Sequence, residues 1–209
     1  MITIALPKGR LGEDTEKLML KAGVIKNGVP KDSRKLIFNL NDKIKVLLVR
    51  AQDVPTYVEK GTADIGVVGK DVLLEHHCDV LELLDLGFGY CKMVVAVSKD
   101  IDPKSVLSSD FLQVGTKYAN IAKKFFSNIS IQAEIIKLYG SVELSAIAGM
   151  ADCIVDIVST GATLRENGLV AIEEIFDSTA RLICNRASFY HKLNVIEKFV
   201  SDIKGALDG

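Results

Sequence analysis

The stretch ADCIVDIVSTGATLRENG, at positions 151–168, decides the fold that we expect for this chain. Its apolar run at 153–158 is typical of a buried strand. The small residues after it predict a turn into a short helix that stops at Asn167-Gly168. A strand that leads through such a turn into a helix is a common anion site, because backbone N–H groups and hydroxyls meet there.

Asp156 distinguishes this turn from a simple phosphate site, because it places a carboxylate in an otherwise apolar strand, four residues before Thr160. A carboxylate repels phosphate, but it accepts hydrogen bonds from sugar hydroxyls and can bind a metal ion. Together, the carboxylate and the turn favour a phosphorylated sugar as the ligand. The alternative is a polar strand-to-helix connection in which Asp156 bonds only to the backbone.

The composition is that of an ordinary globular protein, with 209 residues, 48% of them hydrophobic and 25% charged. This length allows one large α/β domain or two small lobes. The net charge of −1 creates no general attraction to nucleic acids or acidic membranes. No apolar run approaches the roughly 20 residues of a membrane span, and the N-terminus resembles a first strand rather than a signal peptide. We therefore expect a cytoplasmic protein with neither nucleic acid nor membrane as a partner.

The cysteines and histidines predict no metal centre. The four cysteines form no CxxC motif and three lie in apolar runs, so we interpret those as small core residues of a reduced protein. His76-His77 is the only histidine cluster, without nearby cysteines or spaced carboxylates. The cysteines are Cys78, Cys91, Cys153 and Cys184.

Basic residues follow several strands that we predict in the first half, where strands and helices alternate. In open α/β sheets ligands bind at the carboxyl ends of strands, so cations gathered at one edge indicate a polyanion pocket. For the PKGR turn at 7–10, a solvated loop is the alternative. Asp53 is the predicted N-cap of a helix that ends at Gly61. The expected strands are 2–6, 36–40, 44–49, 63–69 and 80–86, the second and third forming a hairpin, and the basic residues are Lys8, Arg10, Arg50 and Lys70.

The second half predicts a second lobe bounded by two long strands, at 90–98 and 180–187. We expect a connection at 103–110, and a helix over 140–149 with Ser141 as its N-cap and Glu143 in its first turn. A Glu in the first turn usually only interacts favourably with the helix dipole, so on its own it does not indicate a functional role. The lobes would be residues 1–90 plus 181–209, and residues 91–180. The chain would pass twice between these lobes, which implies a cleft between them. The remaining expected elements are strands at 111–115, 130–136 and 169–176 and helices at 11–22, 117–126 and 190–207.

Several separated motifs, in order along nearly the whole chain, resemble the short form of ATP phosphoribosyltransferase. They are PKGRL, RAQDVPTYVEKGTADIGVVGKD, TKYANIAKKFF, LYGSVELSAIAG and ADCIVDIVSTGATLRENGL. The resemblance implies a two-lobed α/β fold similar to type II periplasmic binding proteins, with the active site in the inter-lobe cleft. It implies transfer of the phosphoribosyl group of PRPP to N1 of ATP, with Mg²⁺ and release of pyrophosphate, as the first step of histidine biosynthesis. It also implies a regulatory subunit related to histidyl-tRNA synthetase, in a hetero-octamer.

The resemblance also assigns expected roles to individual residues. Asp156 would accept hydrogen bonds from the ribose hydroxyls, and Glu143 would be a second sugar contact or an outer partner of Mg²⁺, which substrate oxygens mainly hold. The 5′-phosphate would bind to Ser159, Thr160, Gly161, Ala162 and Thr163. The triphosphate of ATP and the pyrophosphate of PRPP would bind to Lys8, Arg10, Arg34, Lys35 and Arg50.

One departure and two alternatives accompany the resemblance. Gly115 and Ala119 stand where the family usually has Ala and Pro, so we expect a looser loop there. A non-catalytic two-lobed binding or sensing module has the same fold. A salvage phosphoribosyltransferase of the common fold also has a Thr-rich phosphate loop, but usually with two adjacent acids before it, whereas here Val155 precedes Asp156.

Overall fold

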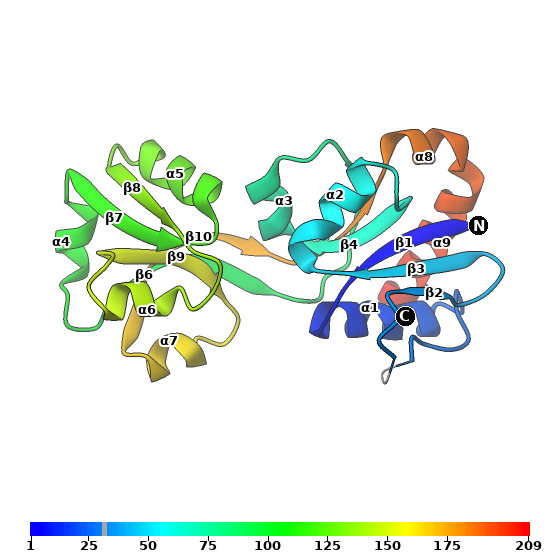
Figure 1. The fold of residues 1–209 in the computed structure, drawn as a ribbon, viewed down its shortest axis with the longest axis horizontal. Coiled ribbons are helices and arrows are strands. Elements are labelled where there is room, and N and C mark those ends of the chain that lie inside the picture. Colours follow the sequence, from blue (N-terminus) through cyan, green and yellow to red (C-terminus); the bar gives the residue numbers. More distant parts are fainter. Residues whose placement is uncertain (31–32) are drawn as a thin grey trace. The chain divides into compact units, whose positions relative to one another are not determined.

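The computed structural model describes residues 1–30 and 33–209, which form two compact units (Figure 1). The first unit comprises Met1–Gly89 and Thr179–Gly209, and the second comprises Tyr90–Ser178. The chain thus leaves the first unit once and returns to it once. The sequence placed these two boundaries after residues 90 and 180.

The first unit is built on a sheet whose described strands have the order β2-β3-β1-β4-β11-β5. These strands are β1 (Ile2–Pro7), β2 (Ile37–Asn39), β3 (Ile44–Val49), β4 (Ile65–Gly69), β5 (Leu81–Asp85) and β11 (Ala180–Cys184). The central strands β1, β3 and β4 are parallel, β2 is antiparallel to β3, and β11 is antiparallel to β4 and β5. The predicted hairpin of the second and third strands is therefore confirmed.

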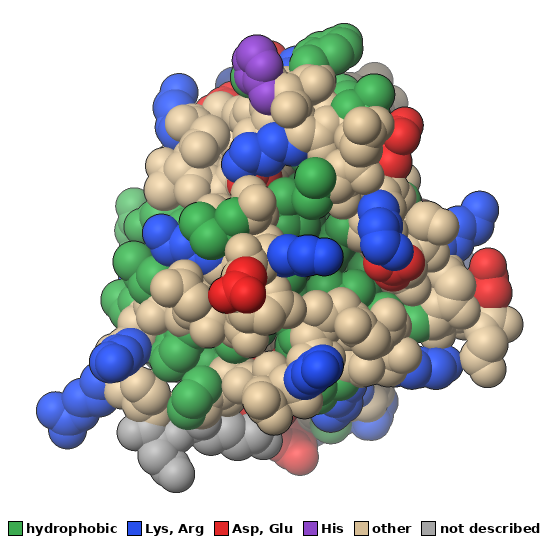
Figure 2. Space-filling view, turned by 90° about the vertical axis from the view of Figure 1, so that its right-hand side faces the viewer, with side chains coloured by type: hydrophobic (Ala, Val, Ile, Leu, Met, Phe, Trp, Pro, Cys, Tyr) green, Lys and Arg blue, Asp and Glu red, His purple; other side chains and the backbone are tan. Residues whose placement is uncertain are grey.

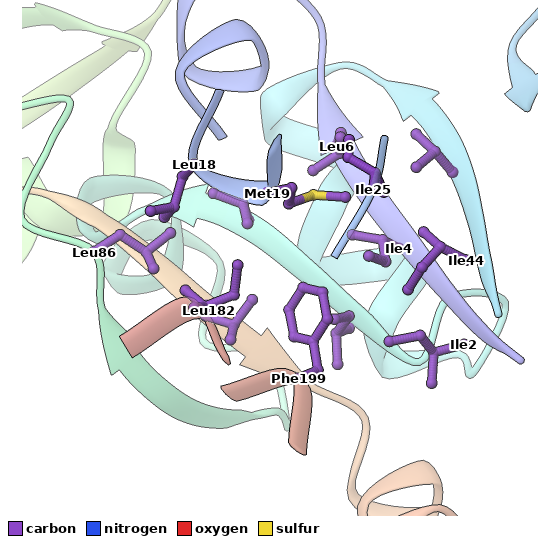
Figure 3. Close-up of a cluster of buried hydrophobic side chains, with 14 of the residues drawn as sticks. Ile2, Ile4, Leu6, Leu18, Met19, Ile25, Ile44, Leu86, Leu182 and Phe199 are labelled. Atoms are coloured by element: carbon purple, nitrogen blue, oxygen red, sulfur yellow. The ribbon is translucent and has the colours of Figure 1, made fainter. Parts of the chain in front are cut away.

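Helices cover both faces of this sheet, and the two-residue period of the strands decides which side chains they meet. Ile2, Ile4 and Leu6 of β1 pack with the α1 and α9 side chains, whereas Ala5 packs with α2 on the other face. Figure 3 shows the first of these cores, with Met19 beside the strands. The helices are α1 (Arg10–Lys21), α2 (Val54–Glu59), α3 (Lys70–His76), α8 (Arg186–His191) and α9 (Leu193–Asp208), and a 3-10 turn spans Ala51–Asp53.

Two details of the first unit differ from the prediction. Asp53 is at the N-cap of α2, but its side chain makes no capping bond to the described residues, because its backbone (φ −91°, ψ −17°) already ends the preceding 3-10 turn. The strand expected over 180–187 ends at Cys184. The side chain of Asn185 accepts a hydrogen bond from the Ser188 N–H at 2.8 Å and begins α8. The expected single helix over 190–207 is consequently replaced by α8 and α9.

Asp64 joins the C-terminal helices to the sheet. Its buried carboxylate accepts hydrogen bonds from the Thr3 N–H at 2.8 Å, the Ser188 hydroxyl at 2.6 Å and Lys192 Nζ at 2.7 Å. Burial raises the pKa of Asp64, but the bonds from Lys192, Ser188 and Thr3 outweigh it, so the pKa lies below its usual value. The ionised form is therefore the one that the fold stabilises.

We expect Asp64→Asn to destabilise the protein by about 1–3 kcal/mol at neutral pH, because charged hydrogen bonds are lost. A lowered folded-state pKa contributes stability above the unfolded value of about 3.9, which is lost as the pH falls through the folded value. The difference between variant and parent should therefore shrink in acid. Urea unfolding at neutral pH and at about pH 3 measures it. A difference that does not change with pH would contradict this role of the Asp64 charge.

The second unit is built on a smaller sheet whose described strands have the order β10-β6-β9-β7-β8. These strands are β6 (Cys91–Ser98), β7 (Phe111–Thr116), β8 (Gln132–Lys137), β9 (Cys153–Val158) and β10 (Leu169–Ser178). β7 is parallel to β8 and β9, and β6 is antiparallel to β9 and β10. The bounds of β9 are those predicted from the sequence.

Short helices cover the second sheet, and two of them position the region of interest. Val94, Ala96 and Ile154 form a core with side chains of α6, α7 and their flanking loops. Asp156, two residues beyond Ile154 on the same strand, lies on this same face. The helices are α4 (Pro103–Leu107), α5 (Ala119–Asn128), α6 (Glu143–Ile147) and α7 (Ala162–Glu166).

Two local predictions for the second unit are wrong. The connection expected over 103–110 contains α4, which begins because the Asp102 side chain accepts a hydrogen bond from the Lys104 N–H at 3.1 Å. Ser141 is not the N-cap of α6. Its φ of +45° belongs to a tight turn, and the N-cap is Val142.

The looser loop expected from Gly115 and Ala119 is also absent from the described residues. Gly115 is a buried residue inside β7, and Ala119 begins α5. A Cβ at position 115 would lie only 2.1 Å from Ser145 Oγ. Glycine at this position therefore accommodates the close approach of Ser145 to the sheet.

The cysteines behave largely as the sequence predicts. The four thiols form no disulfide among the described residues; three are buried, and Cys78 is half-buried. Burial raises the pKa of both Cys153 and Cys184 to about 12, so these thiols are unreactive core groups. Within the described ranges, every helix is too short or too polar to cross a membrane.

Candidate functional site

The second unit contains a cavity of about 120 Å³ at the carboxyl end of β9. Its lining includes Asp156, Glu143 and the segment from Ser159 to Thr163, which we call the donor loop. All the substrate-site residues predicted in this unit therefore line one cavity. Asp156 arrives on the strand, the donor loop follows it, and Glu143 comes from the first turn of α6.

The donor loop has the sharp geometry that its small residues allow. Gly161 has φ +73° and ψ 4°, a left-handed conformation that strains any residue with a side chain. The Arg165 guanidinium donates a hydrogen bond to the Thr160 carbonyl at 3.1 Å, which closes the loop from the α7 side. The hydroxyl-bearing residues Ser159, Thr160 and Thr163 are exposed. The loop thus presents hydroxyls to solvent on a constrained backbone.

The carboxylate of Asp156 is mostly buried, with 13% of its side chain exposed. Its Oδ1 atom accepts a hydrogen bond from the Ile157 N–H at 2.8 Å and lies 3.7 Å from Lys117 Nζ. Among the described residues, neither of these contacts involves Oδ2. Burial raises the pKa of Asp156 and the nearby Glu143 adds to this, while Lys117 and the Ile157 N–H oppose it.

Lys117 is a residue that sequence reasoning missed, although it lies in one of the quoted motifs. It directly follows β7, which is parallel to β9 with Thr116 opposite Val155. The next residues, Lys117 and Asp156, are therefore neighbours across the sheet. A basic residue directly after one strand and an acid in another strand could have suggested the pair, but only the strand order makes them adjacent.

Most of the basic residues predicted in the first unit gather at one edge of its sheet. Pro7 is opposite Val49 in the parallel pair β1–β3, so the residues that follow, Lys8 and Arg50, lie at the same edge. The antiparallel β2 begins at that edge, where the Leu48 N–H donates to the Leu36 carbonyl at 2.8 Å. Arg34 and Lys35, which immediately precede Leu36, therefore come to it as well. Arg10 lies in the first turn of α1, and all five side chains are exposed.

Lys70, and the basic side chains on another face of the first unit, differ from these five residues. Lys70 follows β4 at the same edge, but its Nζ is paired with Glu82 at 2.6 Å. On the face shown in Figure 2, which views the first unit from the side of the N-terminus, Lys and Arg side chains are spread over the surface. The position of Lys8, Arg34, Lys35 and Arg50 at the strand ends is therefore what makes them a candidate site.

A second cavity, of about 350 Å³, adjoins this edge, and the sequence did not predict it. Apolar side chains of Leu6, Val29 and Leu48 line part of it, and the first turns of α1 contribute Glu13 and Glu16. Of the five predicted basic residues, Lys8 contributes to the described lining of this cavity. An apolar wall with carboxylates suits a flat base better than a phosphate chain.

The described residues contain no group of three or more His, Cys, Asp or Glu side chains placed to hold a metal ion. Asp156 and Glu143 nevertheless bring two carboxylates to the same cavity. Oxygen donors of this kind suit Mg²⁺, which usually keeps water and substrate phosphates as most of its ligands. The donor set therefore fits a substrate-held Mg²⁺ better than a protein-held one.

Comparison with known families gives a match over most of the chain. Residues 50–205 match the family model described as ATP phosphoribosyltransferase. A protein named ATP phosphoribosyltransferase from Caldanaerobacter subterraneus is 52% identical over 100% of this chain and 99% of its own length. One from Syntrophotalea carbinolica is 50% identical over 99% of this chain and 95% of its own length.

Two solved structures resemble the fold of the chain. The ATP phosphoribosyl transferase (HisG:HisZ) complex from Thermotoga maritima superposes with a TM-score of 0.86 at 33% identity, covering 100% of this chain and 99% of the other. The periplasmic aliphatic sulphonate binding protein SsuA from Escherichia coli has a TM-score of 0.64 at 12% identity, covering 99% and 68%. The second likeness concerns the fold alone, and it confirms the expected similarity to periplasmic binding proteins.

Proposed function

Because this chain belongs to the ATP phosphoribosyltransferase family, we propose that the cavity at Asp156 holds its phosphoribosyl donor and that the basic residues of the first unit bind its nucleotide. The enzyme transfers the phosphoribosyl group of PRPP to N1 of ATP, with release of pyrophosphate, in the first step of histidine biosynthesis. The observation that carries the assignment is the meeting of Asp156, Glu143 and the donor loop around one cavity.

The ribose of PRPP would be held by the two carboxylates. Oδ1 of Asp156 is already occupied by the Ile157 N–H and Lys117, which leaves Oδ2 to accept hydrogen bonds from the 2′- or 3′-hydroxyl. Glu143 would be a second sugar contact, or would reach Mg²⁺ through water. The 5′-phosphate would bind to the donor loop, through backbone N–H groups and the hydroxyls of Ser159, Thr160 and Thr163.

The nucleotide would use two parts of the first unit. The exposed cations at the sheet edge suit the triphosphate of ATP and the pyrophosphate of PRPP, and arginine can bind such oxygens in pairs. The apolar side of the 350 Å³ cavity, next to Lys8, suits the adenine ring. The cations proposed for phosphate contacts are Lys8, Arg10, Arg34, Lys35 and Arg50.

The chemistry needs no dedicated general base. Adenine N1 already carries a lone pair, and Mg²⁺ supplies charge neutralisation for the departing pyrophosphate. The protein aligns N1 with the anomeric carbon and tolerates the positive charge that develops on the ribose. The negative Asp156, beside that ribose, would stabilise this charge in a mostly buried site, where electrostatic effects are strong.

We further propose that the chain works with a partner in the cytoplasm. Its Thermotoga maritima relative was solved as a HisG:HisZ complex. By extension, this chain would assemble with a regulatory subunit related to histidyl-tRNA synthetase in a hetero-octamer. The near-neutral net charge of −1 favours neither nucleic acid nor a membrane as an additional partner.

Pyrophosphate release tests the proposed reaction against its alternatives. The chain, with and without its regulatory subunit, is given PRPP and Mg²⁺ together with ATP, a free purine base or a free pyrimidine base. Of these three acceptors, we expect only ATP to give release of pyrophosphate from PRPP. Release with a free base would indicate a salvage enzyme, and PRPP binding without release under every condition would indicate a non-catalytic binding module.

Arg50→Ala should raise the KM for ATP roughly 10- to 100-fold, corresponding to about 1–3 kcal/mol for one charged hydrogen-bonding group. Lys43→Ala is the matched control, because this exposed cation precedes the opposite end of β3. Initial rates at saturating PRPP measure both variants. An ATP KM that is unchanged in the Arg50 variant, or equally raised in the control, would remove Arg50 from the nucleotide site.

A further inference from the structure

Lys117 forms an ion pair with Asp156, the carboxylate at the centre of the site, and the fold holds its backbone firmly. The preceding residue, Thr116, donates its hydroxyl to the Val155 carbonyl at 2.6 Å and accepts the Tyr118 N–H at 2.8 Å. Thr116 is 0% exposed and Tyr118 is 2% exposed. Lys117 is therefore anchored on both sides, and one anchor is made to β9, the strand that carries Asp156.

The side chain of Lys117 extends from this fixed backbone to Asp156. Its Nζ lies 3.7 Å from Oδ1 of Asp156 and 5.5 Å from the centre of the Tyr118 ring. The side chain is 34% exposed, so the ammonium remains partly hydrated while its partner is mostly buried. An exposed lysine normally samples many rotamers, but this one has a carboxylate and an aromatic face to hold it.

The charges that face Asp156 come from more than one element. Lys117 reaches it from the end of β7, and Glu143 adds a second carboxylate from α6. The antiparallel neighbour β6 places the apolar Val94 opposite it. On the α7 side, the guanidinium of Arg165 is bonded to the Thr160 carbonyl of the donor loop. Without Lys117, Asp156 and Glu143 would share a small cavity without the ammonium that now lies beside Asp156.

We propose that Lys117 is a positioning residue of the transferase, which keeps the Asp156 carboxylate ionised and engaged through Oδ1 so that Oδ2 can bind the ribose hydroxyls. This inference rests on the function proposed above for Asp156. Lys117 needs no contact with the substrate for this role, since it acts through the carboxylate. Its removal should let the raised pKa of Asp156 rise further, because burial and Glu143 would be opposed by the Ile157 N–H alone.

The test is the affinity for Mg²⁺–PRPP, measured by calorimetry on the full chain between about pH 5 and pH 8. Lys117→Met removes the charge, and Lys124→Met removes an equally charged but exposed side chain from the neighbouring α5. PRPP ionises in the same way in both experiments. The ratio of the two dissociation constants therefore removes its contribution to the pH dependence. We expect this ratio to be roughly tenfold or more at the acid end and to decrease as the pH rises.

The conservative variant Lys117→Arg, which keeps the charge, should have most of the parental affinity at acid pH. If Lys117→Met does not fold, Lys117→Gln replaces it in the comparison. A ratio that is constant with pH would show that Lys117 only supports packing, and would overturn the inference. Asp156→Asn separates this outcome from failure of the proposed function. If Asp156→Asn binds PRPP normally, the proposed site is wrong. If it loses PRPP while the Lys117 ratio is flat, only the positioning role is wrong.

Discussion

Asp156→Asn should lower kcat/KM for PRPP roughly 100- to 1,000-fold, the loss seen when one key electrostatic group is removed from an active site. The neutral amide keeps the shape of the side chain but loses the charge that would bind the ribose and stabilise its developing positive charge. Initial rates of pyrophosphate release at saturating ATP measure the effect. Asp100→Asn, an exposed acid of the same unit, is the matched control and should retain parental activity.

The same variant should be no less stable than the parent at neutral pH. Because the folded-state pKa of Asp156 is raised, its ionised form is disfavoured by folding, and that cost grows as the pH rises above the unfolded value. Replacing it by Asn removes the cost. Loss of activity together with a lower free energy of unfolding at neutral pH would instead mark Asp156 as a structural residue. Near-normal turnover would remove it from the mechanism.

Gly12→Ala should destabilise the first unit and weaken its nucleotide site. Gly12 is buried in the first turns of α1, and a Cβ there would lie 2.0 Å from the Pro7 carbonyl oxygen, at the end of β1. Because the clash is with backbone, the helix or the strand must shift. We expect a loss of roughly 1–3 kcal/mol in stability and weaker ATP binding, since Gly12 and Lys8 line the same cavity.

Gly205→Ala is a matched control for this prediction. Gly205 is also helical, in α9, but an added Cβ there meets open space. Alanine is the better helix former, so this change should stabilise the protein by about 0.5–1 kcal/mol. Thermal unfolding of the two variants should therefore move in opposite directions. Equal or stabilising shifts in both would contradict the close approach of α1 to β1.

Much of the fold could be predicted, because local patterns and tertiary structure agree in this chain. The apolar run of β9 and the glycine after α7 set the bounds of the strand and helix around Asp156. The parallel strands of the first unit place Lys8 and Arg50 at one edge, as expected for basic residues that follow successive strands. The similarity of the fold to periplasmic binding proteins was also predicted, through the family resemblance that the sequence motifs carry.

The missed features depend on contacts between distant parts of the chain. The pairing of Lys117 with Asp156 requires the strand order, which no local pattern contains. The close approaches at Gly12 and Gly115 depend on where Pro7 and Ser145 come to lie. The misplaced cap at Ser141 is a local error, since its preference for caps is overridden by a tight turn with positive φ.

The donor loop, and not the basic edge of the first unit, is the proposed binding site for the ribose-5-phosphate part of PRPP. Amide chemical shifts of the labelled chain, followed while ribose 5-phosphate is added, test it most directly, because this compound lacks the pyrophosphate. We expect the largest changes at 156–164, and much smaller changes at that loop in Asp156→Asn at the same concentration. Changes confined to Lys8–Gly12 and Arg50, with a silent donor loop, would contradict it.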